Sequence, residues 1–132
     1  MATISEKKEK AALAVKECVN LGTVGGVPKA TICEADFEYI ITIPVPGYTK
    51  EDFLIEVSEG ELAVNGQRKA SYFITAPGHY HFKYNKWQRS FILPVDGDGA
   101  FTCAHINHDE LMIHIPKGRK IKLTKPQRVY VY

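Results

Sequence analysis

Short β-prone segments separated by turn residues occupy residues 29–117 and constrain the fold more than any other feature of the sequence. In FLIEVSE, Phe53, Ile55 and Val57 occupy alternate positions, so all three point to one face of a strand. WQRSFILP and ELMIHIP follow the same period of two. About eight such segments at this spacing predict an all-β fold, an antiparallel β-sandwich rather than a parallel α/β sheet.

Glycines between these segments predict where the chain turns. EGELAVNG is expected to form a compact hairpin element in which Leu62 and Val64 share one face. Its turns are expected at Gly60 and at Asn65-Gly66, because an Asn-Gly pair favours the left-handed conformations of tight hairpin turns. DGDG predicts a further turn before the last two segments.

The N-terminal residues predict a helix instead of a strand, because the apolar residues of segment 4–20 follow helical spacing, with Ser5 as the expected N-cap. The helical positions are Ala11, Ala12, Val15, Cys18 and Val19. The glycines and proline of LGTVGGVP then predict a flexible hinge. We therefore expect an N-terminal arm and hinge over 1–28, a sandwich over 29–117 and a C-terminal extension over 118–132.

Composition argues against several functional classes. Lys and Arg number 17 against 15 Asp and Glu, and no basic run is interleaved with aromatics, which argues against nucleic-acid binding. MATISEKKEK lacks the apolar core of a signal peptide, and no apolar run is long enough to cross a membrane. Cys18, Cys33 and Cys103 are isolated and odd in number, so no disulfide framework is expected. These features predict a soluble, cytoplasmic protein.

Residues 67–86 depart from the regular pattern. They contain Ala76-Pro77-Gly78 and then an aromatic-rich alternating segment, YHFKYN. Long connections in compact domains usually have a function. We expect an excursion out of one sheet, carrying a strand whose backbone groups can be satisfied only by adding to a sheet edge.

Four motifs, in this order, resemble the α-crystallin domain of the small heat-shock proteins. VPGYTKEDFLIEVSEGELAVNGQRK resembles the family's proline-glycine loop, hydrophobic strand and glycine-bounded hairpin, and WQRSFILP resembles its aromatic-x-Arg-x-Phe-x-Leu-Pro strand. AHINHDELMIHIPK is similar to the family's alanine and glycine-x-leucine signature, with Asp109 in place of the glycine. Because Asp tolerates the left-handed conformation, this turn is expected to be kept. Val129-Tyr130-Val131 has the form of the family's I/V-x-I/V tail motif.

The resemblance, which covers residues 29–132, implies an ATP-independent holdase chaperone. Such a protein binds partly unfolded clients and suppresses their aggregation; it is not an enzyme and uses no cofactor. The resemblance also implies an immunoglobulin-like antiparallel sandwich, a homodimer and a higher homo-oligomer. The 67–86 excursion would then pair across the dimer interface, whose expected residues are Tyr80, Phe82, Tyr84 and Arg89. An intradomain salt bridge on a sheet surface is the alternative role for Arg89.

In the family the tail motif docks between two strands of a neighbouring subunit, which implies docking roles for Val129 and Val131. The corresponding segments here are FLIEVSE and AFTCAHI, and the expected groove residues are Phe53, Ile55, Val57, Phe101 and Cys103. Burying a valine is worth about 1.5–3 kcal/mol, whereas fixing each backbone residue costs about 1–2 kcal/mol, so a docked tail should exchange. Ile121-Lys122-Leu123 is a second candidate for the docking motif.

The remaining chemistry-bearing residues are interpreted as structural. Five histidines raise the question of a metal site, through His79-x-His81 or His105-x-x-His108, but no third and fourth ligand accompany either pair. The five are His79, His81, His105, His108 and His114, and we interpret them as surface residues. Cys103 could form a catalytic pair with His105 or His114, but without an orienting acid we interpret it as a small core residue.

A second function of a different class keeps the sandwich but not the assembly. A monomeric co-chaperone adaptor of the CS-domain type binds another chaperone and generally lacks both the strand excursion and the tail motif. Deletion of residues 70–84 separates the two hypotheses, because an adaptor should keep its size whereas a holdase should lose its dimer. An enzyme is the least supported class, since the sequence offers no phosphate loop, metal quartet or nucleophile-base pair.

Overall fold

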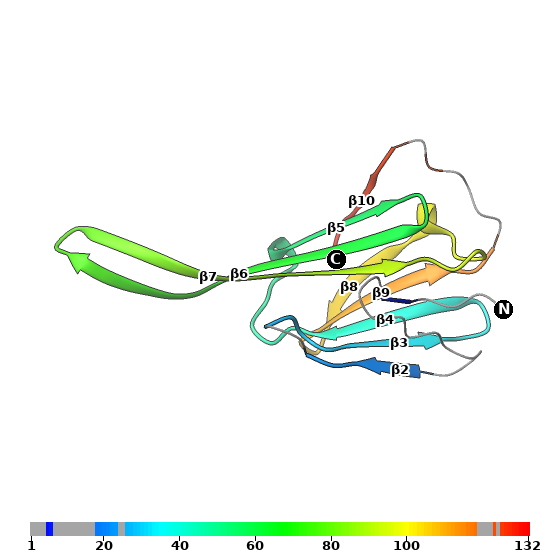
Figure 1. Cartoon of the computed structure of the whole chain (residues 1–132), viewed down its shortest axis with the longest axis horizontal. Helices are drawn as coiled ribbons and strands as arrows, with labels where there is room; N and C mark the ends of the chain where they lie inside the picture. The colour runs from blue at the N-terminus through cyan, green and yellow to red at the C-terminus, as the bar shows by residue number, and fades with distance from the viewer. Residues whose placement is uncertain (1–4, 7–17, 24–25, 119–122, 124) are drawn as a thin grey trace.

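The computed structural model describes residues 5–6, 18–23, 26–118, 123 and 125–132. Two five-stranded antiparallel sheets face each other in it (Figure 1). The first sheet has the order β1-β7-β6-β5-β10, and the second has the order β2-β3-β4-β9-β8. The strands of the first sheet are β1 (Ser5–Glu6), β5 (Phe53–Ser58), β6 (Glu61–Ala76), β7 (His79–Ile92) and β10 (Gln127–Val129). Those of the second are β2 (Cys18–Leu21), β3 (Ala30–Glu34), β4 (Glu38–Pro44), β8 (Cys103–Asn107) and β9 (Glu110–Pro116).

The core lies between the two sheets and confirms the predicted antiparallel β-sandwich. Each central strand sends alternate side chains inward, as a period of two requires. The buried positions include Ile41, Ile43, Ile55, Val57, Leu62, Val64, Phe91, Leu111, Ile113 and Ile115. Two single-turn 3-10 helices, η1 (Lys50–Asp52) and η2 (Gly99–Phe101), connect strands of the two sheets. None of the helices among the described residues is both long and apolar enough to cross a membrane.

Three predicted turns have different outcomes. The β8–β9 turn holds His108 and Asp109 at φ angles of 50° and 62°, so the left-handed conformation expected at Asp109 is confirmed. Gly60, at φ 77°, also lies in a turn, between β5 and β6. The turn expected at Asn65-Gly66 is wrong, because both residues lie within β6 and pair with Gln88 and Trp87 of β7.

The N-terminal helix prediction is wrong wherever the structure describes this segment. Ser5–Glu6 pair with Phe91 and Ile92 of β7, and Cys18–Leu21 form an antiparallel pair with β3; residues 7–17 lie outside the described part of the chain. Leu21 is buried, and Val19, two positions earlier, packs against the core. Apolar spacing alone does not separate a short strand from a thin helical face, and the open edge of β3 favours the strand.

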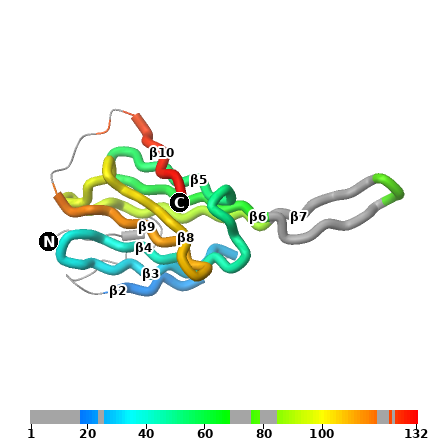
Figure 2. The backbone as a smooth tube through the Cα atoms, turned by 180° about the vertical axis from the view of Figure 1, so that it is seen from behind, coloured from blue at the N-terminus to red at the C-terminus, as the bar shows by residue number. Residues whose placement is uncertain are grey.

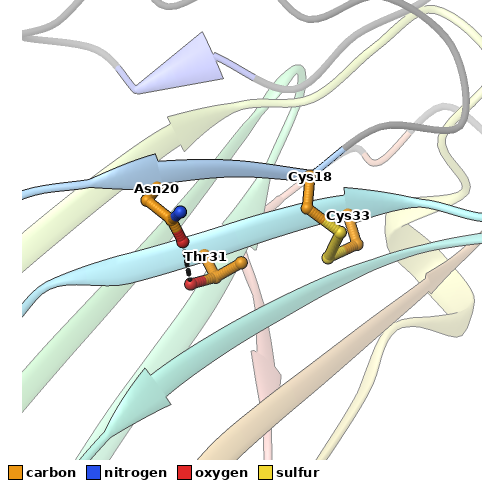
Figure 3. The surroundings of a disulfide bond; sticks show 4 residues. All are labelled: Cys18, Asn20, Thr31 and Cys33. Carbon is orange, nitrogen blue, oxygen red and sulfur yellow. Dashed lines mark hydrogen bonds between the residues drawn. A yellow bond between two sulfur atoms is a disulfide. The ribbon is translucent and has the colours of Figure 1, made fainter.

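The cysteine prediction also needs correction. Cys18 and Cys33 are directly opposite across β2 and β3, with Cα atoms 4.1 Å apart, and they form a disulfide (Figure 3). In an antiparallel pair, opposed residues that exchange no backbone hydrogen bonds approach this closely. Two register positions away, Thr31 Oγ1 donates a 2.8 Å hydrogen bond to Asn20 Oδ1. The cysteine pattern therefore gives no support for a reducing compartment.

Two pairs of partly or fully buried polar side chains lie near the ends of β3, β7 and β9 and the start of β4. Tyr39 Oη donates a 2.7 Å hydrogen bond to Asp96, and Lys117 Nζ donates a 2.6 Å hydrogen bond to Glu34. Burial and the Asp96 carboxylate together raise the pKa of the Tyr39 phenol well above its usual value. The first pair joins the start of β4 to the chain that follows β7, and the second joins the end of β3 to the chain that follows β9.

Candidate functional site: the tail groove and the hairpin

The C-terminal tail forms an edge strand on its own sandwich. Strand β10 runs antiparallel to β5, with Gln127 opposite Val57 and Val129 opposite Ile55. Gln127 Nε2 also donates a 3.0 Å hydrogen bond to the carbonyl oxygen of Ala100. The tail therefore satisfies the backbone edge that β5 would otherwise expose.

The last residues of the chain reach the second sheet. Val131 forms a parallel bridge with Ala104 of β8. Tyr132 N donates a hydrogen bond to Ala104 O, and Ile106 N donates one to Tyr132 O, each at 3.0 Å. The tail thus extends from β5 of the first sheet to β8 of the second, along the side of the sandwich (Figure 2).

The tail motif alternates between buried and exposed side chains. Val129 is 5% exposed and belongs to the core, and Val131 packs against it. Tyr130 and Tyr132 are 61% and 79% exposed. This alternation accounts for the residue types at the end of the chain: the valines point into the groove between β5 and β8, and the tyrosines point to solvent.

The groove residues expected from the sequence divide into two groups. Phe53, Ile55 and Val57 are buried along β5 beneath the tail. Phe101 is exposed in the η2 turn, and Cys103 is exposed on β8, so the core position expected for Cys103 is wrong. On β8 the side chains that turn inward are Ala104 and Ile106 instead. A shift of one residue along a strand moves every side chain to the other face, and the sequence does not fix that phase for a short edge strand.

The second candidate element is a long hairpin. Strands β6 and β7 pair with each other from Glu61 and Ile92 out to Ala76 and His79, with one register irregularity midway along the hairpin and one near its tip. The excursion expected over 67–86 is therefore present, but within one chain its strands pair with each other and not with a separate edge. The side chains of Tyr80, Phe82 and Tyr84 lie outside the described part of the structure.

Neighbouring strands cover only the base of this hairpin. Strand β5 pairs with β6 over residues 61–66, and β1 pairs with β7 only at Phe91 and Ile92. From Gln67 and Lys86 outward, the described strands leave both outer edges of the hairpin without a third strand. Figure 1 shows this part projecting well beyond the sandwich. Its backbone donors and acceptors are thus available to water or to another strand.

An aromatic cluster supports the base of the hairpin. Gly66 lies opposite Trp87, and a Cβ atom on Gly66 would fall 2.5 Å from Trp87 Cζ2, so only glycine lets the indole lie across β6. Trp87 Nε1 donates a 3.0 Å hydrogen bond to Tyr48 Oη. Tyr48 also stacks on Phe53, and the guanidinium of Arg68 lies over the other side of the cluster, 5.6 Å from the Tyr48 ring centroid.

Arg89 lies in the interior, although it is charged. It is 2% exposed, on β7 opposite Val64. Its Nε donates a 2.7 Å hydrogen bond to the Pro28 carbonyl oxygen, and an Nη atom donates one of 2.5 Å to the Gly22 carbonyl oxygen. Arg89 thereby joins the first sheet to the segment between β2 and β3. Its expected role at a dimer interface stays a prediction.

Sequence reasoning missed three contributors to these sites: Ala104 and Ile106 as the β8 side of the groove, and Gly66 beneath Trp87. A glycine inside a strand pattern can indicate the close approach of another group. Gly66 gave this signal, but the Asn-Gly pair was interpreted as a turn instead. Of the second tail candidate, Ile121 and Lys122 lie outside the described residues. Leu123 packs against the core.

The family relationship follows from comparison with known proteins. The model of the Hsp20/alpha crystallin family matches residues 31–132. The chain belongs to this family. The predicted resemblance is confirmed, and the family implies chaperone function in the stress response. Its members are not enzymes.

Two relatives of this chain are small heat shock proteins of different organisms. Small heat shock protein C4 of Rickettsia felis is 28% identical over 101 residues, which cover 74% of this chain and 61% of that protein. The mitochondrial small heat shock protein hspI of Dictyostelium discoideum is 31% identical over 104 residues, covering 74% of this chain and 46% of the relative. The chain thus matches less than two thirds of the length of either relative.

Solved structures support the fold. A small heat-shock protein from Xylella fastidiosa, whose crystal structure reveals a distinct high order structure, matches with a TM-score of 0.58 at 25% identity. That match covers 75% of this chain and 97% of the other. Heat shock protein 16.0 from Schizosaccharomyces pombe matches with a TM-score of 0.59 at 21% identity, over 80% and 82% of the two chains. Both likenesses agree with the two-sheet α-crystallin sandwich.

Proposed function

We propose that this small heat-shock protein is an ATP-independent holdase that binds partly unfolded proteins and suppresses their aggregation. In this proposal homodimers form through the hairpin, and larger homo-oligomers form through exchange of C-terminal tails between subunits. The groove between β5 and β8 binds clients when the tail leaves it. We also propose that the protein acts in the cytoplasm, without nucleic-acid or membrane partners.

The observation that carries the proposal is the tail in the groove. Two partly or fully buried valines contribute about 1.5–3 kcal/mol each, and each backbone hydrogen bond contributes about 0.5–1.5 kcal/mol. Ordering the tail costs about 1–2 kcal/mol per residue. The two sums are of similar size, so docking is reversible. A departing tail would uncover Ile55 and Ala104 together with two unpaired strand edges, which is the surface that an extended apolar client segment requires.

The hairpin supports the dimer. Its outer part carries two uncovered edges, and a twisted two-stranded ribbon alone is marginally stable in water. Pairing with a strand of a second copy would satisfy these edges. The aromatic cluster at Trp87 and Gly66 fixes the direction in which the hairpin leaves the sandwich, so the partner strand would be met at a defined angle.

One experiment separates assembly from folding. Residues 70–83 are replaced by an Asn-Gly turn that joins Lys69 to Tyr84, which are paired across the hairpin, so that the base ladder is kept. Sedimentation should show the unmodified chain well above its 14.8 kDa monomer mass and the shortened chain without its dimer. Unchanged size after the replacement contradicts the hairpin interface.

A second experiment tests the tail and the holdase activity. Val129→Ala combined with Val131→Ala should shrink the particles, because the exchanged tail loses its buried side chains. Tyr130→Ala combined with Tyr132→Ala is the matched control, since both tyrosines are largely exposed. Light scattering of a heated client protein without ATP measures holdase activity. A chain that does not suppress this aggregation at equimolar subunits contradicts the proposal.

The same tail contact favours a second candidate. A tail seated in its own groove closes the sandwich as a single compact unit, which fits a monomeric adaptor of the CS-domain type. Such an adaptor would sediment as a monomer, would keep its size when the hairpin is shortened and would leave client aggregation unchanged. These three results together would replace the holdase with the adaptor.

A further inference from the structure

Two histidines face each other on the outer surface of the second sheet. His105 lies on β8 and His114 on β9, and their Nε2 atoms are 3.0 Å apart. The rings are nearly parallel, with an interplanar angle of 15°. Their neighbours Ala104 and Ile113 are buried, so both imidazoles lie on the opposite, outward face. Nine residues separate them in sequence, and strand pairing brings them together.

Glu38 holds one of these imidazoles in a defined state. Its carboxylate, on β4, accepts a hydrogen bond from His114 Nδ1. A carboxylate only accepts, so the proton of a neutral His114 lies on Nδ1, and its Nε2 presents a lone pair toward His105. An imidazole oriented by a carboxylate on its other nitrogen is the usual arrangement of a metal-binding histidine.

We propose that His105 and His114 chelate a divalent transition-metal ion through their Nε2 atoms, with Glu38 as the positioning residue. The ion takes the place of the single Nε2 proton of His105. That proton moves to Nδ1 of the same ring by exchange with water, so both imidazoles stay neutral and no proton is lost. This site does not depend on the proposed holdase function.

Ligand chemistry indicates which ion fits. Two metal–nitrogen bonds of about 2.0 Å can span nitrogens that lie 3.0 Å apart, so one ion can bind both imidazoles after small side-chain movements. Imidazole suits several transition-metal ions, including Zn²⁺, Ni²⁺ and Cu²⁺. Cu²⁺ is the ion of choice, since it binds nitrogen ligands most tightly in the first-row divalent series.

The chain supplies two ligands to this site. In the part of the chain that the structure describes, no three His, Cys, Asp or Glu side chains converge to hold a metal ion. Cys103 is paired with His114 across β8 and β9 and is exposed, but it does not complete such a group. Water would occupy the remaining positions of the metal. The site is thus an open two-histidine chelate, which gives exchangeable binding and not a structural metal centre.

The test uses the full chain without an affinity tag and with Cys103→Ser in every protein, so that no free thiol contributes. Cu²⁺ is titrated and followed by calorimetry and by electron paramagnetic resonance. The expected result is one site per chain with two equatorial nitrogen ligands. His105→Ala or His114→Ala should weaken binding at least tenfold, and Glu38→Gln should weaken it about tenfold through the lost orientation. Mg²⁺, which prefers oxygen ligands, should not bind.

The controls use the other histidines. His108→Ala, in the β8–β9 turn close to the site, should leave Cu²⁺ affinity unchanged, as should His79→Ala combined with His81→Ala. Circular dichroism confirms that each variant is folded. The proposal is overturned if the His105 and His114 variants bind Cu²⁺ as the parent does, or if only the His79 and His81 change removes binding. It is equally overturned if the spectrum shows fewer than two nitrogen ligands.

Discussion

Strands β2 and β10 are both edge strands, but they are attached to the sandwich in different ways. Each is a short strand from outside the central sandwich that covers an open edge, β2 on β3 and β10 on β5. The Cys18–Cys33 disulfide fastens β2 covalently, and Arg89 binds the carbonyl groups that follow it. Strand β10 is held by three paired residues, two valines and the bridge at Ala104.

This difference in attachment predicts a difference in exchange. A disulfide closing a loop of 15 residues stabilises a fold by about 3 kcal/mol, chiefly by restricting the unfolded chain. Under oxidising conditions β2 is thus a permanent edge strand. The tail is close to energetic balance and should leave and return. We therefore expect the edge at β5 and β8 to open to partners, whereas β2 keeps the edge of β3 covered.

The largest effect is expected from Arg89→Met, which removes the polar anchor behind β2. The substitution removes two hydrogen bonds from a buried, charged donor to the carbonyl groups of Gly22 and Pro28, so the free energy of unfolding should fall by about 3–5 kcal/mol. Urea denaturation followed by tryptophan fluorescence measures the change. Lys86→Met, at an exposed position on the same strand, should cost less than about 0.5 kcal/mol. A loss below 1 kcal/mol for Arg89→Met would show that the anchor is not needed.

The next effect is expected at the disulfide. Cys33→Ser should lower the free energy of unfolding by about 3 kcal/mol in non-reducing buffer. A reducing agent should bring the unmodified protein down to the stability of the variant, and the two should then unfold together. Cys103→Ser should have no such effect, because that thiol is free and exposed. Equal stability of parent and Cys33→Ser in non-reducing buffer would contradict the covalent attachment of β2.

A smaller effect is expected at the tail. Val129→Ala removes a buried side chain, but its cost cannot exceed the free energy with which the tail docks, so about 1 kcal/mol or less is expected. Hydrogen exchange is the more sensitive measurement. The Ile106 amide, which donates to Tyr132 O, should lose protection in the variant, while Tyr130→Ala leaves it unchanged. Full protection after Val129→Ala would show a tail as firmly attached as β2.

The smallest effect is expected from Arg128→Ala. The Arg128 guanidinium lies 4.8 Å from the Tyr130 ring centroid on the exposed side of the tail. Exposed cation–π contacts contribute about 0.5–1 kcal/mol. Exchange of the Ile106 amide should therefore accelerate only about two- to fivefold. Acceleration as large as that of Val129→Ala would mean that the exposed face of the tail, and not its valines, holds it in place.

Much of the sandwich could be predicted because its signal is local. The alternation of Phe53, Ile55 and Val57 records which side of a strand is apolar, and that side is the one buried. The turn at Asp109 could be predicted for the same reason, because whether a residue tolerates the left-handed conformation depends on its own type. The same approach predicted the wrong element for the N-terminal segment. Val19 and Leu21 alternate as in a strand, but the stretch is too short for this pattern to be distinguished from one face of a helix.

The candidate sites were harder to predict because they depend on which strands are neighbours. The tail valines could be recognised as apolar and branched, but their partners Ala104 and Ile106 depend on the phase of an edge strand. Gly66 reads as part of a turn until Trp87 is placed across from it. These residues acquire their roles from contacts between segments that are separated in the sequence.

The sequence by itself determined a two-layer sandwich with a polar outer surface. Apolar and polar side chains alternate along each strand, and this pattern can be seen in each strand without knowledge of its neighbours. Only the tertiary structure decided that Cys18 faces Cys33, that His105 faces His114 and that the tail lies across β5 and β8. Register between strands is set by the packing of the whole core and by the satisfaction of backbone edges. No local pattern records that choice.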